Sequence, residues 1–161
     1  MCPELKVWNQ AGFESGNLGE FGFAISIQPK AAQGVVLRSD FAGERLDLYF
    51  DDVVEGPGAA SRADIEELFA FGQKWLAVAR SSPAKAALVV HCGAGISRSA
   101  AAALLLLSLY FGSYREAAAQ LYRSHPNVSP NALVCRLIGQ KLGASYGGDI
   151  LAELGKGGRF R

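Results

Sequence analysis

Residues 91–99 read His-Cys-Gly-Ala-Gly-Ile-Ser-Arg-Ser, which places a thiol, a guanidinium and two hydroxyls around two glycines. The segment follows a short apolar run, AALVV at 86–90, that is typical of a buried strand, and it precedes a longer apolar run typical of a helix. Glycine at positions 93 and 95 lets the backbone curl, so that successive amide groups point inward and form an anion-binding nest. The first N–H groups of the following helix add to this nest, and Arg98 can bind two oxygens of a tetrahedral oxyanion. The pattern indicates a site for a phosphate-like dianion.

Cys92 lies at the base of the same nest, where the field that attracts phosphate also stabilises a thiolate. A free cysteine has a pKa of about 8.5, and a helix N-terminus with a cationic neighbour lowers it to roughly 3.5–7.5. Cys92 could instead be a buried structural thiol without a catalytic role. The presence of Gly95, Arg98 and Ser99 at these spacings favours a nucleophilic cysteine. We therefore expect Cys92 to attack the phosphorus of a bound phosphate ester and form a covalent phosphocysteine.

The pattern HC-x5-RS with central glycines resembles the signature of the cysteine-dependent protein tyrosine phosphatase superfamily, in a small, bacterial-like member of its dual-specificity-type branch. The resemblance is strongest over residues 46–138 and implies a phosphatase that needs no metal or other cofactor. It implies that Cys92 is the nucleophile, that Arg98 clamps the phosphate, and that the Ser99 hydroxyl assists departure of the thiolate. His91 is implied to order the loop and tune the thiol, without acting as a base. The implied phosphate cradle consists of the backbone amides of Gly93, Ala94, Gly95, Ile96, Ser97 and Arg98.

A general acid is also required, because an alkoxide or phenoxide leaves poorly unless it is protonated. The family resemblance implies an Asp on a loop some tens of residues before the cysteine, and LDLYFDDVVEG is a strand followed by acids. Asp52 is the preferred candidate, because Phe50-Asp51-Asp52-Val53 resembles the family pattern of F-x-D followed by an aliphatic residue. Asp51 is the alternative. Asp64 is a poorer candidate, since a place in the first turn of a helix already explains it.

The segment SHPNVSPNAL at 124–133 carries a further, weaker match to the family, a Pro-Asn pair that opens the last helix. The resemblance implies that the amide of Asn131 braces the phosphate loop. Ser129 with Pro130 at the first helical position predicts the start of that helix.

The order of predicted elements places this loop in a layered fold. Short strands are expected at 23–27, 35–37, 46–50 and 86–90. Helices are expected after Ser61, with Asp64 in a capping box, over about 98–111, and after Ser113 with Glu116. We predict an α/β domain with a mainly parallel central sheet, helices on both faces, and the phosphate-binding loop between a strand and a helix.

Length and composition limit the remaining possibilities. The 161 residues suit one domain, which we place at 1–145, followed by a loosely held tail at 146–161. Apolar residues at 50% exclude intrinsic disorder, and a net charge of +1 argues against nucleic acid as a partner. Three cysteines and two histidines give neither a disulfide framework nor a zinc spacing, and no signal peptide is visible, so a reducing, cytoplasmic compartment is expected. The apolar run at 100–107 falls short of the roughly 20 residues of a membrane span.

Two other kinds of function remain open at this point. A rhodanese-like sulfur transferase also holds a cysteine in a looped anion nest, and a phosphate-binding module need not catalyse. Arsenate reduction is less favoured, because it needs resolving thiols nearby, and Cys2 and Cys135 are distant in sequence. Positions 93–97 contain no lysine, which favours a singly phosphorylated protein or small phosphoester and argues modestly against phosphoinositides. Phosphotyrosine, phosphoserine or phosphothreonine, and small metabolites all stay possible, and the oligomeric state is not predicted.

Overall fold

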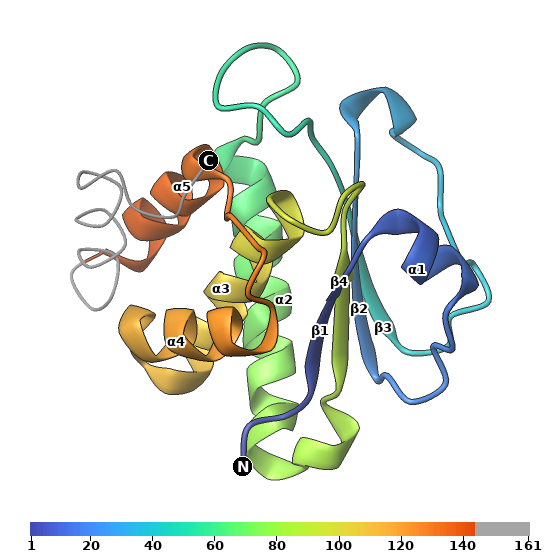
Figure 1. Cartoon of the computed structure of the whole chain (residues 1–161), viewed down its shortest axis with the longest axis vertical. Coiled ribbons are helices and arrows are strands. Elements are labelled where there is room, and N and C mark those ends of the chain that lie inside the picture. Colours follow the sequence, from blue (N-terminus) through green and yellow to red (C-terminus); the bar gives the residue numbers. More distant parts are fainter. Residues whose placement is uncertain (144–161) are drawn as a thin grey trace.

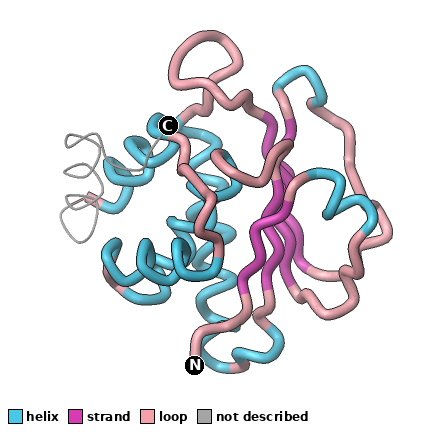
Figure 2. Tube along the Cα trace, viewed as in Figure 1, coloured by secondary structure: helices cyan, strands magenta, loops and turns pink. Residues whose placement is uncertain are grey.

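The central sheet consists of four parallel strands in a computed structural model that describes residues 1–143. The strands are β1 (Leu5–Trp8), β2 (Phe23–Gln28), β3 (Glu44–Tyr49) and β4 (Leu88–His91), in the order β1-β4-β2-β3 (Figure 2). Ile25 of β2 pairs with Val90 of β4 on one side and with Leu46 of β3 on the other. Because all four strands run in the same direction, their carboxyl ends meet at one edge of the sheet, where α/β proteins build their sites.

Helices cover both faces of this sheet, as predicted, but unequally (Figure 1). Four helices lie on one face, namely α2 (Arg62–Ser81), α3 (Arg98–Phe111), α4 (Tyr114–Ser124) and α5 (Ala132–Leu142). In the described part of the chain, the short helix α1 (Gln10–Ser15) is the one helix on the other face. Two short 3-10 turns, η1 (Lys30–Ala32) and η2 (Pro83–Lys85), complete the elements. The α/β fold with a parallel sheet is therefore confirmed.

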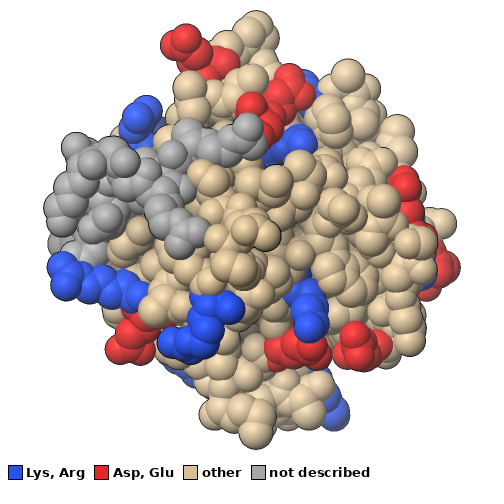
Figure 3. Space-filling model, in the orientation of Figure 1, with Lys and Arg blue, Asp and Glu red and all other residues tan. Residues whose placement is uncertain are grey.

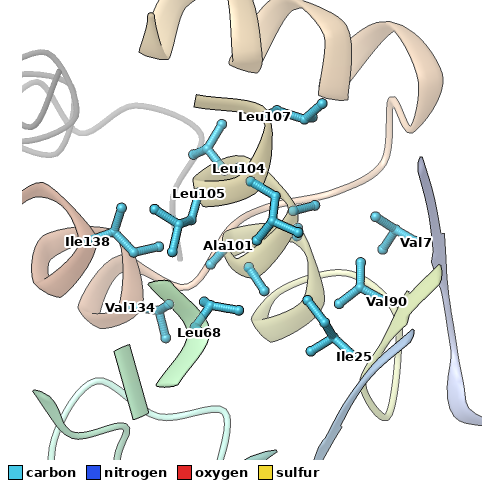
Figure 4. Packing of buried hydrophobic residues seen from close by; sticks show 14 of the residues in the cluster. Val7, Ile25, Leu68, Val90, Ala101, Leu104, Leu105, Leu107, Val134 and Ile138 are labelled. Carbon is cyan, nitrogen blue, oxygen red and sulfur yellow. The ribbon is translucent and has the colours of Figure 1, made fainter. Parts of the chain in front are cut away.

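Helix α3 is the centre of the core, and every residue from Arg98 to Leu109 is buried. Its alanines at 100–103 have little side-chain bulk, and its leucines at 104–107 fill the space between the helices and the sheet. Figure 4 shows Leu105 beside Val134 and Ile138 of α5. This packing explains the longest apolar run of the sequence. None of the described helices is long and apolar enough to cross a membrane.

The predicted helix caps are present where they were expected. The Ser61 Oγ accepts a hydrogen bond from the Asp64 N–H (3.3 Å), and the Asp64 carboxylate accepts one from the Ser61 N–H (2.8 Å). Ser113 caps α4 through the N–H of Glu116 (3.3 Å). Asp64 is thus part of a capping box, which supports setting it aside as an acid.

Two local predictions were wrong, and two short elements were missed. Residues 35–37 form a turn-rich segment instead of a strand; Val35 and Val36 are each 50% exposed, and β3 already occupies the edge beside β2. The strand β1 and helix α1 were missed, because four residues with one buried position give no readable alternation. The last helix begins at Ala132 with Asn131 as its cap, since the N–H of Ser129 instead binds the Ile96 carbonyl (2.9 Å). The predicted boundary between 145 and 146 lies outside the described residues.

Candidate active site

Residues 92–97 connect the buried strand β4 to the N-terminus of α3 at the carboxyl edge of the sheet. Gly95 has a φ of 70°, a left-handed conformation that favours glycine. A Cβ atom at Gly95 would lie 2.7 Å from the backbone nitrogen of Asn9 and 2.7 Å from the carbonyl carbon of Trp8. The Gly93 carbonyl accepts a hydrogen bond from the N–H of Gln10 (3.1 Å). The junction of β1 and α1 therefore forms the rear wall of the curled loop.

We expect Gly95→Ala to damage this loop in two ways. The new Cβ would meet backbone atoms that cannot move aside, and alanine is strained at this φ by roughly 1–2 kcal/mol. Vanadate affinity, measured by calorimetry, should fall at least about tenfold, because amides displaced by even 1 Å no longer converge on an oxyanion. Gly34→Ala is the matched control: it also replaces a glycine of positive φ (94°), but among the described residues no heavy atom beyond its chain neighbours lies within 4 Å of its Cβ position. Equal vanadate affinity in the two variants would contradict the prediction that the loop at 92–97 binds the oxyanion.

The Cys92 side chain is buried, at 1% exposure, and its Sγ lies 3.1 Å from the Oγ of Ser99. Burial raises the pKa of the thiol, but the Ser99 hydroxyl, the backbone amides of Ser99 and Gly95, and the charge of Arg98 together outweigh it. The pKa of Cys92 is therefore below its ordinary value. These neighbours therefore favour the thiolate form of Cys92 more than an ordinary site would. Cys135, buried in α5 without such neighbours, has a pKa raised well above the ordinary thiol value by burial.

The Arg98 side chain is also buried, at 8% exposure. One terminal nitrogen, Nη1, donates to the Phe50 carbonyl at the end of β3 (2.9 Å). Its Nε has no hydrogen-bond partner among the described residues. A buried guanidinium N–H without a protein partner is costly, and a bound oxyanion would satisfy it. The geometry therefore agrees with a phosphate clamp anchored on one side to the backbone.

His91 is wholly buried behind the loop, where its Nε2 lies 2.7 Å from the Ser26 hydroxyl. Its ring stacks on Phe13 with a centroid distance of 4.0 Å and an interplanar angle of 20°. Burial lowers the pKa of His91 to about 4, against smaller opposing contributions that include the Cys92 backbone. The imidazole is therefore neutral at pH 7 and fixed in place, which agrees with an ordering role.

Asp52 lies against the loop although it is 45 positions from Ser97 in sequence. The Ser97 hydroxyl donates to its Oδ1 (2.6 Å), and the Asn131 side-chain amide donates to the same oxygen (3.0 Å). The same amide nitrogen also donates to the Val53 carbonyl (3.2 Å), while the Asn131 backbone N–H donates to the Ser97 carbonyl (3.1 Å). Asn131 thus contacts the loop through its backbone, and its side chain holds the acidic segment. The sequence analysis assigns Ser97 only a backbone amide of the cradle and misses its hydroxyl, because no local pattern indicates a partner 45 residues away.

Asp51, the alternative acid, points into its own loop. Its Oδ1 accepts a hydrogen bond from the Lys30 N–H (2.9 Å), and its backbone N–H donates to the Gly58 carbonyl (2.7 Å). These contacts close the 51–58 turn and fasten it to η1. The geometry favours Asp52 over Asp51 as the carboxyl that faces the loop.

Within residues 1–143, no group of three or more His, Cys, Asp or Glu side chains lies close enough together to hold a metal ion.

Comparisons with known proteins identify the fold. No protein-family model matches the chain, and no curated protein matches it by sequence. Among solved structures, human DUSP28 superposes with a TM-score of 0.62 at 21% identity, covering 94% of this chain and 96% of that chain. The human tyrosine phosphatase-like serine/threonine/tyrosine-interacting protein superposes with a TM-score of 0.66 at 19% identity, covering 86% and 90%. PTPMT1 in complex with PI(5)P gives a TM-score of 0.58 at 15% identity, with 94% of both chains covered. The chain therefore has the fold of dual-specificity-type phosphatases of the cysteine-dependent superfamily.

Proposed function

We propose that this protein is a cysteine-dependent phosphatase that hydrolyses phosphate monoesters through a phosphocysteine intermediate. One observation carries the proposal: Cys92, with a lowered pKa, lies in a glycine-containing loop together with Arg98 and Ser99, and a carboxyl group from a distant loop faces it. A nucleophile, an oxyanion clamp and an acid converge on one place, which is the set of groups that phosphoryl transfer needs.

In the first step, the phosphate oxygens are bound by the loop amides and the Arg98 guanidinium, and the Cys92 thiolate attacks phosphorus. The S–P bond forms while the P–O bond to the leaving group breaks. Asp52 gives its proton to the departing oxygen, so that an alcohol leaves instead of an alkoxide. The Ser97 hydroxyl and the Asn131 amide, which both donate to Oδ1 of Asp52, hold this carboxyl at the loop for that transfer.

In the second step, the Asp52 carboxylate takes a proton from water, and the resulting hydroxide oxygen attacks the phosphocysteine. The S–P bond breaks and the electron pair returns to sulfur. The Ser99 hydroxyl, 3.1 Å from Sγ, stabilises the departing thiolate by hydrogen bonding. Inorganic phosphate leaves, and the resting thiolate is regenerated.

Two features support a singly phosphorylated substrate, a phosphotyrosine or dual-specificity phosphoprotein foremost. Residues 93–97 contain no lysine, and Arg98 is the cation at the loop. On the face shown in Figure 3, basic side chains are interspersed with acidic ones and make no continuous basic field for a polyanion. The neighbour PTPMT1 was solved with PI(5)P, so a phosphoinositide belongs in the substrate panel as the contrasting outcome. The unpaired state of all three cysteines agrees with a reducing, cytoplasmic setting.

A non-catalytic phosphate-binding module is the second candidate, since one structural neighbour is described as phosphatase-like and as an interacting protein. The discriminating experiment is turnover of p-nitrophenyl phosphate and of phosphopeptides by the purified protein in excess EDTA, with vanadate as competitor. Turnover that vanadate inhibits competitively supports the phosphatase. Vanadate binding without turnover of any substrate would favour the binding module. Thiosulfate:cyanide transfer, assayed in parallel, would favour a sulfur transferase.

A further inference from the structure

The C-terminal end of helix α1 is held by a single arginine from a distant loop. The Arg38 Nη1 donates to the carbonyls of Phe13 (3.0 Å), Glu14 (3.3 Å) and Gly16 (2.8 Å). These carbonyls at the helix end lack partners within the helix, and a cation beside them is stabilising. The Nε and Nη2 of Arg38 bond to the Asp40 carboxylate (2.9 and 3.1 Å), which orients the guanidinium.

The loop that presents this arginine is itself fixed to the sheet. Arg45 of β3 donates to the carbonyls of Arg38 and Leu37, each at 2.9 Å, and makes a bidentate pair with Asp47. Arg38 has a φ of 54° and is the one non-glycine residue with positive φ within residues 1–143. An arginine in this conformation costs roughly 1–2 kcal/mol, so the surrounding contacts must compensate for it.

Helix α1 in turn touches the phosphate-binding loop at two places. Its first N–H, from Gln10, donates to the Gly93 carbonyl (3.1 Å), and Phe13 stacks on His91, the residue before Cys92. Because α1 stands alone on its face of the sheet in the described structure, no neighbouring helix presses it against the loop (Figure 1). The contacts form one continuous series from β3 through Arg38 and α1 to the loop.

We propose that Arg38 is a positioning residue that holds α1 against the phosphate-binding loop and thereby maintains the loop's oxyanion affinity and the ionisation of Cys92. This inference rests on the proposed function, because it assigns the loop a catalytic task. Without the clamp, the C-terminal end of α1 gains freedom, and the whole short helix is held less firmly against the loop. The Gly93 carbonyl and the His91 ring then lose a fixed support, and the loop amides converge less well on sulfur and on phosphate.

The test uses variants that suit the backbone at position 38. Arg38→Gly and Arg38→Asn remove the guanidinium while tolerating positive φ, so relief of strain offsets part of the lost stability. Arg38→Lys keeps the charge without the planar fork. Asp40→Asn weakens the pair that orients the guanidinium while keeping Arg38, and Arg115→Met removes an exposed arginine of α4 as a control.

For the glycine and asparagine variants we expect KM and the vanadate Kd to rise about tenfold, with kcat close to that of the unmodified protein. The midpoint of the pH profile for alkylation of Cys92 by iodoacetamide should rise by about one pH unit. Arg38→Lys and Asp40→Asn should each show a smaller rise in each quantity, whereas Arg115→Met should show none. Alkylation and vanadate binding require no turnover, so they test the clamp even if the unmodified protein hydrolyses nothing.

The proposal would be overturned if the variants had a lower melting temperature but an unchanged KM, vanadate affinity and alkylation midpoint. Arg38 would then contribute to stability alone. The proposal would also be overturned if the alkylation midpoint shifted fully in Arg38→Gly but not at all in Arg38→Lys. The charge, and not the clamp on α1, would then act on Cys92.

Discussion

Replacement of Cys92 by serine should lower kcat at least about 10⁴-fold while leaving vanadate or phosphate affinity within a few-fold of the unmodified protein. A serine hydroxyl at this position is a far weaker nucleophile at pH 7 than a thiolate. The proposed oxyanion site, by contrast, consists of the loop amides and Arg98, neither of which the substitution removes. The expected signature is thus loss of turnover with retention of binding.

The measurement combines steady-state kinetics in EDTA with calorimetry of oxyanion binding. Cys2→Ser is the matched control, because Cys2 is a half-buried thiol outside the loop, and it should keep normal kcat and KM. Acid quenching during turnover, followed by peptide mass spectrometry, should place phosphate on Cys92. Ser99→Ala should increase the amount trapped, since departure of the thiolate is slowed. Substantial turnover by Cys92→Ser would exclude a phosphocysteine mechanism.

The loop at 91–99 could be read from sequence because its requirements are local. Gly93 and Gly95, Arg98 at the helix start and Ser99 one residue later all lie within a few positions of Cys92. The preceding strand and following helix are also strongly patterned: β4 is buried on both faces, and α3 is apolar almost throughout. Short-range geometry therefore decides where these side chains point, and the alternating order of strands and helices predicts the parallel sheet.

The supporting contacts could not be read in the same way. Contact of Gly95 with the backbone of Trp8 and Asn9 depends on β1 pairing with β4, more than 80 positions away in sequence. The bond from Ser97 to Asp52 likewise joins two loops whose separation is set by the whole sheet. Nothing in the sequence distinguishes Arg38 from the other arginines. Its contact with the C-terminal end of α1 depends on a helix that is itself too short to predict. Long-range contacts of short elements carry no local pattern.

Asp52→Asn should lower kcat about 10²-fold or more, and the deficit should grow as the leaving group becomes a weaker acid. Asparagine keeps the shape of aspartate and can still accept from Ser97 and Asn131, so the loop should hold its position and KM should change little. The amide has no proton to give to the departing oxygen and cannot activate water. A phenyl phosphate substrate should therefore suffer more than p-nitrophenyl phosphate, whose phenolate leaves without help.

The pH profile of kcat/KM separates Asp52 from Asp51. On the acid side, activity requires the Cys92 thiolate, and the lowered pKa of Cys92 lets activity persist to lower pH than an ordinary thiol would allow. On the alkaline side, activity falls as the general acid loses its proton, so Asp52→Asn should flatten this limb and leave the acid limb in place. Asp51→Asn should keep both limbs, because the contacts of Asp51 are to Lys30 and to its own turn. If Asp51→Asn instead abolished the alkaline limb while Asp52→Asn preserved it, the proton donor would be Asp51, and the hydrogen bonds from Ser97 and Asn131 would serve to anchor the loop.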